Sequence, residues 1–396
     1  MNNQVTNTLF ETPFGDFNLK RIPDKDKNLL AWNSADRYLL KHLFSLQEAG
    51  TIDLHKAKIL ILNDAFGALT VPLSQFSCDS YSDSFVSQEA IRINSIYGAA
   101  TLDNINFLKS TETLSSQYDV VLFKEVKNQG FLQDEMLQVA QHITPDALVI
   151  GAFMAKNLQQ NSIKILNKTI GDTQASLAWK KARLLFVQPN KHNSDDGDDT
   201  KTSQIFNYQL EDGNEKIYNL SNVFSKNKLD IGTRFFLQHL PQRYQDEEKK
   251  YHNIIDLGCG NGVLALKMAQ AYPEAKLTCV DESYMAIASA KMTLEANLVM
   301  ENRDVDYIAS NVLLDFAENT SDLIVCNPPF HQQLVVSDSI AWQMLQQSKE
   351  VLKKGGELWV VGNRHLNYHL KLQKIFGNYK LIATNNKFVI LKSFKN

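Results

Sequence analysis

The sequence predicts two α/β domains in tandem, each built on a seven-stranded, mostly parallel sheet of the doubly wound, Rossmann-like type. The length of 396 residues is that of two or three ordinary domains. In the C-terminal half, strand-like and helix-like hydrophobic periods alternate, which indicates a parallel sheet covered by helices on both faces. The N-terminal half repeats this layout with different residues, which indicates an internal duplication.

The composition excludes several other classes of protein. Hydrophobic residues make up 44% and charged residues 21% of the chain, as in ordinary globular proteins. The first 18 residues lack the pattern of a secretory signal, and no apolar run is long enough to cross a bilayer. The four cysteines form no C-x-x-C pair, and His365 and His369 lack a third ligand, so we expect no disulfide framework and no metal site. We therefore expect a cytoplasmic protein that needs no membrane and no oligomer.

A polar segment divides the chain into two halves. Residues 191–203 contain four aspartates around one glycine and no apolar residue, which is typical of a linker. We therefore expect one domain over residues 1–190, an acidic linker over 191–204 and a second domain over 205–396. The net charge is only −3, but residues 351–396 hold nine basic residues against one acid. A polyanionic partner is compatible with that end of the chain.

The C-terminal half contains seven strand candidates. The last two are joined by the turn-forming Thr384-Asn385-Asn386, which predicts a closing hairpin. Helical patterns over Gly262–Ala271 and Tyr284–Ala296 separate the first strands. The strand candidates are Asn253–Leu257, Lys276–Asp281, Asp304–Ala309, Asp322–Cys326, Glu357–Gly362, Tyr379–Ala383 and Lys387–Lys392.

Three motifs of the N-terminal half align with motifs of the C-terminal half at nearly constant offsets. Setting Gly67 on Gly262 gives an offset of 195 residues, and the next two motifs match at 199 and 203 residues. These are the segments that begin at Tyr81 and Tyr118. Although any two α/β sheets share some spacings, three matches in the same order favour a duplicated domain.

A glycine-rich turn follows the first strand of the second domain and indicates a nucleotide-like ligand. Gly258, Gly260 and Gly262 permit a tight turn at a helix N-terminus. The G-x-G-x-G spacing is shorter than that of dinucleotide folds. Asp256, before the turn, suits a ligand that carries an ammonium group, such as the methionine part of S-adenosylmethionine. Asp281 ends the next strand, where a carboxylate can accept hydrogen bonds from ribose hydroxyls.

A second motif, Asn327-Pro328-Pro329-Phe330, follows the fourth strand. The Asn327 side-chain oxygen and the Pro328 carbonyl can be directed together at one amino group, because prolines fix the backbone and donate no N–H. Such acceptors suit methyl transfer to an amino nitrogen conjugated with a ring or carbonyl. Phe330 can stack on a planar substrate. The motif ends a strand at the edge of the sheet where α/β proteins bind ligands.

These residues resemble the N-methyltransferases that carry N-P-P-F/Y, and among them the ribosomal RNA guanine-N2 methyltransferases of the large subunit. The D-L-G-C-G-N-G turn, Asn222–Thr233, Asn327–Gln332 and Ala31–Asp36 carry the resemblance, which covers nearly the whole chain. The expected terminal hairpin is typical of S-adenosylmethionine-dependent methyltransferases. The resemblance implies two fused methyltransferase-like domains, of which only the second is active and the first helps to hold RNA. It also implies that Asn311 hydrogen-bonds the adenine of the methyl donor.

The first copy departs from the second at the positions that carry chemistry. Its residues lack both the acid and the flexible glycines of the turn, and they lack the paired acceptors of the second motif. Ile61, Asn63 and Ala65 stand where the second copy has Asp256, Gly258 and Gly260, and Lys124-Glu125-Val126 stands where it has Asn327-Pro328-Pro329. We therefore expect the N-terminal domain to be catalytically inactive.

The sequence thus predicts methyl transfer from S-adenosylmethionine to the exocyclic N2 of a specific guanine in 23S ribosomal RNA. Two alternatives within the same class are a guanine of the small subunit and a protein glutamine amide, although glutamine methyltransferases normally have Tyr in place of Phe330. A non-enzymatic RNA-binding protein is an alternative of another class, and Asp256, Asp281 and Asn327 argue against it. A nicotinamide dehydrogenase disagrees with both the turn spacing and the hairpin.

Overall fold

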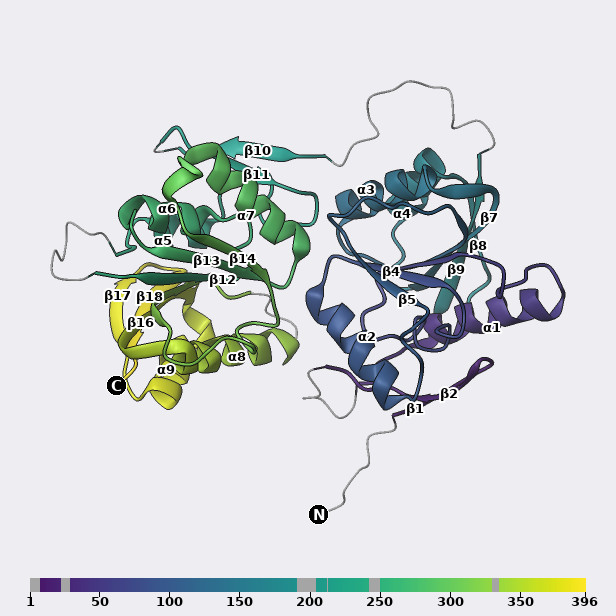
Figure 1. Ribbon diagram of the computed structural model, residues 1–396, viewed down its shortest axis with the longest axis horizontal. Coiled ribbons are helices and arrows are strands. Elements are labelled where there is room, and N and C mark those ends of the chain that lie inside the picture. The colour runs from purple at the N-terminus through teal and green to yellow at the C-terminus, as the bar shows by residue number, and fades with distance from the viewer. Residues whose placement is uncertain (1–7, 23–28, 191–203, 212, 242–249, 330–334) are drawn as a thin grey trace, which may run out of the picture. The chain divides into compact units, whose positions relative to one another are not determined.

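The protein forms two compact units, over Met1–Gln204 and Ile205–Asn396. The computed structural model (Figure 1) describes residues 8–22, 29–190, 204–211, 213–241, 250–329 and 335–396. Each unit contains a seven-stranded, mostly parallel sheet, and helices lie on both of its faces. This architecture confirms the predicted fold class. The segment 191–203, expected to be a linker, lies outside the described residues.

The N-terminal unit holds one small hairpin, one large sheet and four helices in its described part. The hairpin consists of β1 (Leu9–Thr12) and β2 (Gly15–Asn18). The sheet strands are β3 (Ile59–Leu62), β4 (Cys78–Ser82), β5 (Ile105–Lys109), β6 (Tyr118–Lys124), β7 (Ile143–Met154), β8 (Gly171–Ala175) and β9 (Ala182–Pro189). The helices are α1 (Ser34–Glu48), α2 (Phe85–Tyr97), α3 (Gln129–Ala140) and α4 (Gln160–Thr169).

The C-terminal unit has the same plan with five helices in its described part. A hairpin of β10 (Phe206–Gln209) and β11 (Lys216–Asn219) precedes the sheet. The sheet strands are β12 (Asn253–Leu257), β13 (Lys276–Asp281), β14 (Val305–Ala309), β15 (Ser321–Cys326), β16 (Leu352–Asn363), β17 (Lys380–Thr384) and β18 (Phe388–Phe394). The helices are α5 (Ile231–Leu237), α6 (Val263–Ala271), α7 (Tyr284–Asn297), α8 (Val335–Val351) and α9 (Tyr368–Phe376), with short 3₁₀ turns at Met300–Asn302 and Arg364–Leu366.

Both large sheets have the same strand order, with the last strand inserted antiparallel by a hairpin. The orders are β5-β4-β3-β6-β7-β9-β8 and β14-β13-β12-β15-β16-β18-β17. In each sheet the order reverses at the first strand, between β3 and β6 and between β12 and β15. Ligands of doubly wound sheets bind at this switch point, outside the carboxyl ends of the strands. The topology therefore places a ligand site beside β12 and β15.

Hydrogen-bond register establishes which residues of the two units are equivalent. Ile59 pairs with Cys78 and Val120, whereas Ile254 pairs with Leu277 and Leu323. The corresponding residues are 195, 199 and 203 positions apart, as the sequence motifs indicated. A glycine with positive φ also follows the first strand of each sheet at matching positions, because Gly67 and Gly262 have φ values of 86° and 76°.

Alternate residues of the central strands pack into two separate cores. Ile254 belongs to the cluster under α6 and α7, whereas Ile255 and Leu257 belong to the cluster under α8 and α9. A strand covered on both faces must be apolar throughout, which is why β3 reads Ile-Leu-Ile-Leu and is fully buried. All four cysteines are buried and unbridged.

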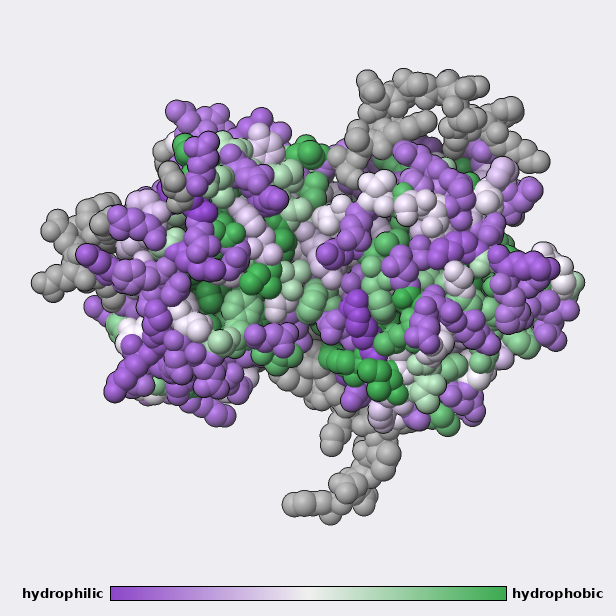
Figure 2. Space-filling view, in the orientation of Figure 1, coloured by the Kyte–Doolittle hydropathy of each residue, from purple (hydrophilic) through white to green (hydrophobic). Residues whose placement is uncertain are grey.

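The outer surface of the protein is largely hydrophilic on the face shown in Figure 2. Hydrophobic residues gather there over α2, where Ile93 and Ile96 are exposed. Across the described ranges, no helix combines the length and the apolarity that a membrane crossing requires.

The sequence predicted most strands of the second sheet closely, and other elements were not predicted. β12 and β13 have the expected bounds, and β14 and β15 differ from the prediction by one residue at their N-terminal ends. The hairpin β10–β11 and helix α5 were not predicted, because both are short and their stability comes from packing on the rest of the unit. β16 is longer than predicted, because Leu352 pairs with Ser321 before the register shifts.

Candidate active site

A cavity of about 430 Å³ lies at the carboxyl ends of β12, β13 and β15. That volume is within the roughly 300–1,000 Å³ of typical small-ligand sites. The wall includes the glycine turn, the end of β13, the N-terminal turn of α5 and the segment after β15. Every residue of the wall belongs to the C-terminal unit. The cavity is therefore at the switch point that the strand order defines.

The glycine turn is held tightly against the neighbouring strand. The backbone N–H groups of Gly258 and Cys259 donate to the Val280 carbonyl at 2.8 and 3.0 Å. Gly262 precedes α6 with φ of 76°, and a Cβ there would lie 2.8 Å from the Ala290 Cα. Any side chain at Gly262 would therefore separate α6 from α7. Gly258 and Gly260 line the cavity, whereas Gly262 lies behind them.

Asp281 is the acid of the cavity wall that the sequence assigned to ribose. Its Oδ2 accepts from the Gly260 N–H at 3.0 Å, and its Oδ1 accepts from the Ser283 N–H at 3.0 Å. These two hydrogen bonds fix the carboxylate beside the glycine turn. A carboxylate oxygen can accept more than one hydrogen bond, so Asp281 can also accept from a ligand in the cavity.

Asp256 is placed differently from what its motif suggested. It is fully buried and does not line the cavity. One oxygen accepts from the Ala265 N–H at 2.9 Å, and the other has no hydrogen-bond partner among the residues that the structure describes. Burial raises the pKa of Asp256 to about 7; the hydrogen bond from Ala265 opposes this rise and the charge of Asp281 adds to it. The structure therefore places this carboxyl beneath the turn, where it anchors the first turn of α6.

Asn327 directly follows β15, and its side chain lies against the first turn of α5. Its Nδ2 donates to the Thr233 hydroxyl at 2.8 Å. Its Oδ1 is buried without a hydrogen-bond partner in the described part of the chain. Pro328 and Pro329 continue the cavity wall beside it. A buried acceptor without a partner is unfavourable, and a ligand that donates a hydrogen bond would relieve that cost.

The structure brings most of the predicted site residues together, with three exceptions besides Gly262. Gly258, Gly260, Asp281, Asn327 and Pro328 line the cavity. Asp256 lies beneath it, and Asn311 is absent from its wall although both neighbours, Ser310 and Val312, line it. Phe330 lies outside the described residues, so its predicted stacking role stays a prediction.

Several polar residues of the cavity wall were not predicted as site residues, among them Tyr208, Asp230 and Thr233. Tyr208 comes from β10 and accepts a hydrogen bond from the Asn261 amide at 3.2 Å. Burial raises the pKa of Tyr208 to about 12, so it remains a neutral hydroxyl. Asp230 and Thr233 begin α5. Both belong to the segment that carried the family resemblance, which was the only signal in the sequence that could have indicated them.

The equivalent turn of the N-terminal unit is closed by its own side chains. Asn63 occupies the position of Gly258 with φ of 64°. Its amide donates to both oxygens of the buried Glu135 at 2.9 Å. Ser82 occupies the position of Asp281, so the carboxylate that could bind ribose is missing.

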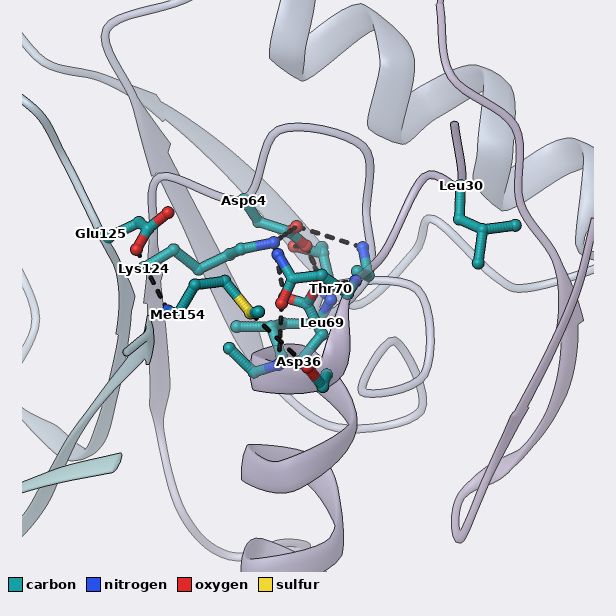
Figure 3. A network of polar contacts seen from close by, with 12 residues as sticks. Leu30, Asp36, Asp64, Leu69, Thr70, Lys124, Glu125 and Met154 are labelled. Atoms are coloured by element: carbon teal, nitrogen blue, oxygen red, sulfur yellow. Dashed lines mark hydrogen bonds and ion pairs between the residues drawn. The ribbon is translucent and has the colours of Figure 1, made fainter. Parts of the chain in front are cut away.

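Lys124, at the position of Asn327, is part of a buried ionic network in the N-terminal unit. Figure 3 shows its ammonium group directed at Asp36 and Asp64, to which it is 2.5 and 3.7 Å distant. Burial opposes its charge, but Asp36 and Asp64 outweigh this effect and raise the pKa of Lys124 above its usual value. Asp64 also accepts hydrogen bonds from the N–H groups of Leu69 and Thr70. This position therefore holds a cation where the described part of the C-terminal unit has an acceptor without a partner.

The residues of the C-terminal cavity fit S-adenosylmethionine. The glycine turn leaves space against the backbone, Asp281 offers acceptors for ribose hydroxyls, and the Asn327 oxygen is a spare acceptor for the group to be methylated. Among the described residues, no cluster of three or more His, Cys, Asp or Glu side chains could hold a metal ion. The fold and this site define an S-adenosylmethionine-dependent methyltransferase.

Comparisons with known proteins narrow this class to one family. The Methyltransferase small domain family matches residues 214–392, and the RLMG N-terminal domain family matches residues 7–191. The chain is 42% identical over 381 residues to ribosomal RNA large subunit methyltransferase G of Vibrio vulnificus, covering 95% of this chain and 96% of that protein. It is 39% identical over 384 residues to the protein of that name from Pseudoalteromonas translucida, covering 96% of each. The chain belongs to the ribosomal RNA large subunit methyltransferase G family.

A solved structure has a similar fold over most of the chain. It is the T. thermophilus 16S rRNA N2 G1207 methyltransferase in complex with AdoMet and guanosine, with a TM-score of 0.72. The two chains are 19% identical, and the match covers 88% of this chain and 90% of that chain. This likeness extends across both units and agrees with the tandem fold.

The raised pKa of Asp256 predicts a specific dependence of stability on pH. An unfolded Asp titrates near ~3.9, so between about pH 4 and 7 the folded chain holds a proton that the unfolded chain has released. The contribution of this group to stability therefore falls as the pH rises through that window, by on the order of 1 kcal/mol per pH unit. Asn has the same shape and does not titrate. We expect Asp256→Asn to gain stability relative to the wild type between pH 5 and pH 8, measured by scanning calorimetry.

The matched control for this measurement is Asp306→Asn, which removes an acid that pairs with Lys276 on the surface. A difference between Asp256→Asn and the wild type that stays constant from pH 5 to pH 8 would contradict a raised pKa at Asp256.

Proposed function

We propose that this protein transfers the methyl group of S-adenosylmethionine to the exocyclic N2 of a guanine in 23S ribosomal RNA, in the cytoplasm. The observation that carries this proposal is the buried Oδ1 of Asn327, which lies at the wall of the cavity and has no hydrogen-bond partner among the residues that the structure describes. An amino group conjugated with a ring can donate a hydrogen bond to that oxygen. The large-subunit enzymes to which the chain is similar over about 95% of its length support the choice of RNA.

We assign the residues of the glycine turn and of β13 to the methyl donor. Asp281 accepts hydrogen bonds from the ribose hydroxyls, and Gly258 and Gly260 let the donor approach the backbone. Asp256 acts indirectly, because its hydrogen bond to Ala265 keeps α6 and the turn in place. Asn311 lies between two wall residues, and a role for it at the adenine remains part of the proposal.

Asn327 and Pro328 act on the amino group of the target base. A hydrogen bond from the amine to Asn327 Oδ1 localises the nitrogen lone pair and orients it for in-line attack. S-adenosylmethionine supplies an activated methyl group on a sulfonium. The nitrogen forms the new N–C bond as the C–S bond breaks, and the amine then releases one proton to water. The guanine must leave its stack to reach the cavity, and we assign Phe330 to hold its ring.

The alternatives within the enzyme class are less well supported. The solved structure of similar fold comes from a small-subunit enzyme, but its 19% identity indicates fold alone. A protein glutamine amide is also conjugated and fits the same acceptor. The relatives that match nearly the whole chain are named for the large ribosomal subunit, which favours the 23S guanine.

We further propose that the N-terminal unit is catalytically inactive and recruits RNA. Its turn is closed by Asn63 and Glu135, and Lys124 replaces the acceptor. A surface of half-buried aromatic rings and exposed lysines on this unit, which we call the Trp179 patch, suits RNA. It consists of Tyr38, Lys41, Leu177, Trp179 and Lys180.

The contacts of the Trp179 patch favour unpaired bases and phosphates. The Tyr38 and Trp179 rings lie 5.5 Å apart, and Leu177 is 87% exposed. Lys41 and Lys180 place their ammonium groups 5.9 and 4.9 Å from the Trp179 ring. Aromatic rings stack on bases, and neighbouring lysines bind phosphates.

Nucleoside mapping tests the reaction directly. The purified chain is incubated with methyl-labelled S-adenosylmethionine and 23S ribosomal RNA from cells that lack the modification, and the RNA is digested to nucleosides. We expect the label in N2-methylguanosine from one position. Label in N-methylglutamine of ribosomal protein, or in 16S RNA alone when both RNAs are present, would contradict the proposed substrate.

If the Trp179 patch binds RNA, a substitution there should lower RNA affinity without lowering the rate of methyl transfer. Stacking contributes roughly 1 to 3 kcal/mol per base, so Trp179→Ala should weaken binding of 23S RNA about 5- to 150-fold in a filter-binding assay. The rate at saturating RNA should stay near that of the wild type, because the cavity lies in the other unit. Lys56→Ala, which removes an exposed charge elsewhere on the N-terminal unit, is the matched control. Equal RNA affinity for Trp179→Ala and Lys56→Ala would remove the patch from the RNA interface.

A further inference from the structure

The amide of Asn327 can act on an amine in only one of its two orientations. Its Oδ1 accepts hydrogen bonds, whereas its Nδ2 only donates them. Turning the amide over by 180° would direct two N–H donors at the N–H groups of the substrate. Methyl transfer by the proposed route therefore requires something that holds Nδ2 away from the substrate and Oδ1 toward it.

Thr233 is placed to hold the amide in the required orientation. Its hydroxyl oxygen lies 2.8 Å from Asn327 Nδ2 and accepts that hydrogen bond. The same hydroxyl donates to Asp230 Oδ2 at 3.3 Å. A carboxylate only accepts hydrogen bonds, so the Thr233 proton is directed at Asp230 and its oxygen remains an acceptor. An acceptor at this place matches Nδ2 and repels Oδ1.

The cap of α5 fixes the position of the Thr233 hydroxyl. Asp230 is the N-cap residue, and its Oδ2 also accepts from the Thr233 backbone N–H at 2.9 Å. Thr233 is only 6% exposed. A β-branched side chain has few rotamers in a helix. The hydroxyl is thus set by backbone geometry and not by contact with a ligand.

The N-terminal unit provides an internal comparison for this contact. Asp36 is the third residue of α1 after its N-cap Asn33, as Thr233 is the third residue of α5 after Asp230. Asp36 contacts Lys124, which is equivalent to Asn327. The same two positions therefore touch in both units. In the N-terminal unit they form an ion pair. In the C-terminal unit they form a neutral hydrogen bond, and the buried Oδ1 of Asn327 has no partner among the described residues.

We propose that Thr233, oriented by Asp230, is a positioning residue that directs Asn327 Oδ1 at the amine to be methylated. This inference rests on the proposed function, because it assigns Thr233 a role in the same reaction. Thr233 acts through Asn327. Its contribution must therefore disappear when the Asn327 amide is removed.

A double-mutant cycle measures this coupling in the full-length chain. Single-turnover methylation of unmodified 23S RNA is followed for the wild type, Thr233→Val, Asn327→Ala and the double variant. Val has the shape of Thr without the hydroxyl, so Thr233→Val should lower the rate about 10- to 100-fold, as small misplacements of reacting groups do. The affinities for S-adenosylmethionine and RNA should change less than about twofold, and Thr233→Ser should restore most of the rate. In the Asn327→Ala background, Thr233→Val should have no further effect.

A matched control distinguishes the loss of Asn327 positioning from the general effect of removing a buried threonine hydroxyl. Thr293 is buried in α7 and its hydroxyl accepts from the Tyr218 N–H at 3.0 Å. Thr293→Val should leave the methylation rate unchanged. Two results would overturn the inference. One is a wild-type methylation rate in Thr233→Val, and the other is that Thr233→Val lowers the rate by the same factor in the wild type and in Asn327→Ala. Failure of the wild type to label guanine N2 at all would instead overturn the proposed function.

Discussion

The register of β12 between β13 and β15 is the constraint on which the site depends. Leu257 pairs with Val280 on one side and Cys326 on the other. The residues that follow them, Gly258, Asp281 and Asn327, therefore leave the sheet at the same level and face one cavity. The N-terminal sheet keeps this register, since Leu62 pairs with Tyr81 and Phe123. There the residues that follow are Asn63, Ser82 and Lys124, so the same scaffold carries different side chains at the equivalent positions.

The sequence was sufficient to predict the fold class and the approximate positions of the strands of the second sheet along the chain. Central strands of parallel sheets are apolar on both faces, and they are followed here by glycines that permit a tight turn and by prolines that fix the backbone. Apolar runs and the glycine or proline motifs after them involve residues that are close in sequence, so they can be recognised without the structure. The offsets between the two copies could be read from the sequence because each strand is followed by a recognisable motif, and the hydrogen-bond register pairs the same residues. The site residues inferred from the two motifs were mostly found at the cavity.

Contacts between distant segments could not be predicted in this way. Thr233 and Asn327 are 94 residues apart, and no periodicity links a helix cap to a residue after a strand. Asp256 was expected to face the ligand, but its carboxyl turns to the N–H of Ala265 nine residues further on. The direction of a side chain at a strand end depends on how the next helix returns over the sheet. The motif placed an acid before the turn, and the structure places its carboxyl beneath the turn.

The rate of methyl transfer by Asn327→Ala tests most directly the claim that an unpartnered amide oxygen orients the amine. Under single-turnover conditions with unmodified 23S RNA, the account predicts a rate about a hundredfold to a thousandfold below that of the wild type, as when one preorganised hydrogen-bond partner is removed. Affinity for S-adenosylmethionine, measured by calorimetry, should stay within about twofold, whereas Asp281→Ala should weaken it. A wild-type rate of guanine methylation by Asn327→Ala would contradict the account and show that another group activates the amine.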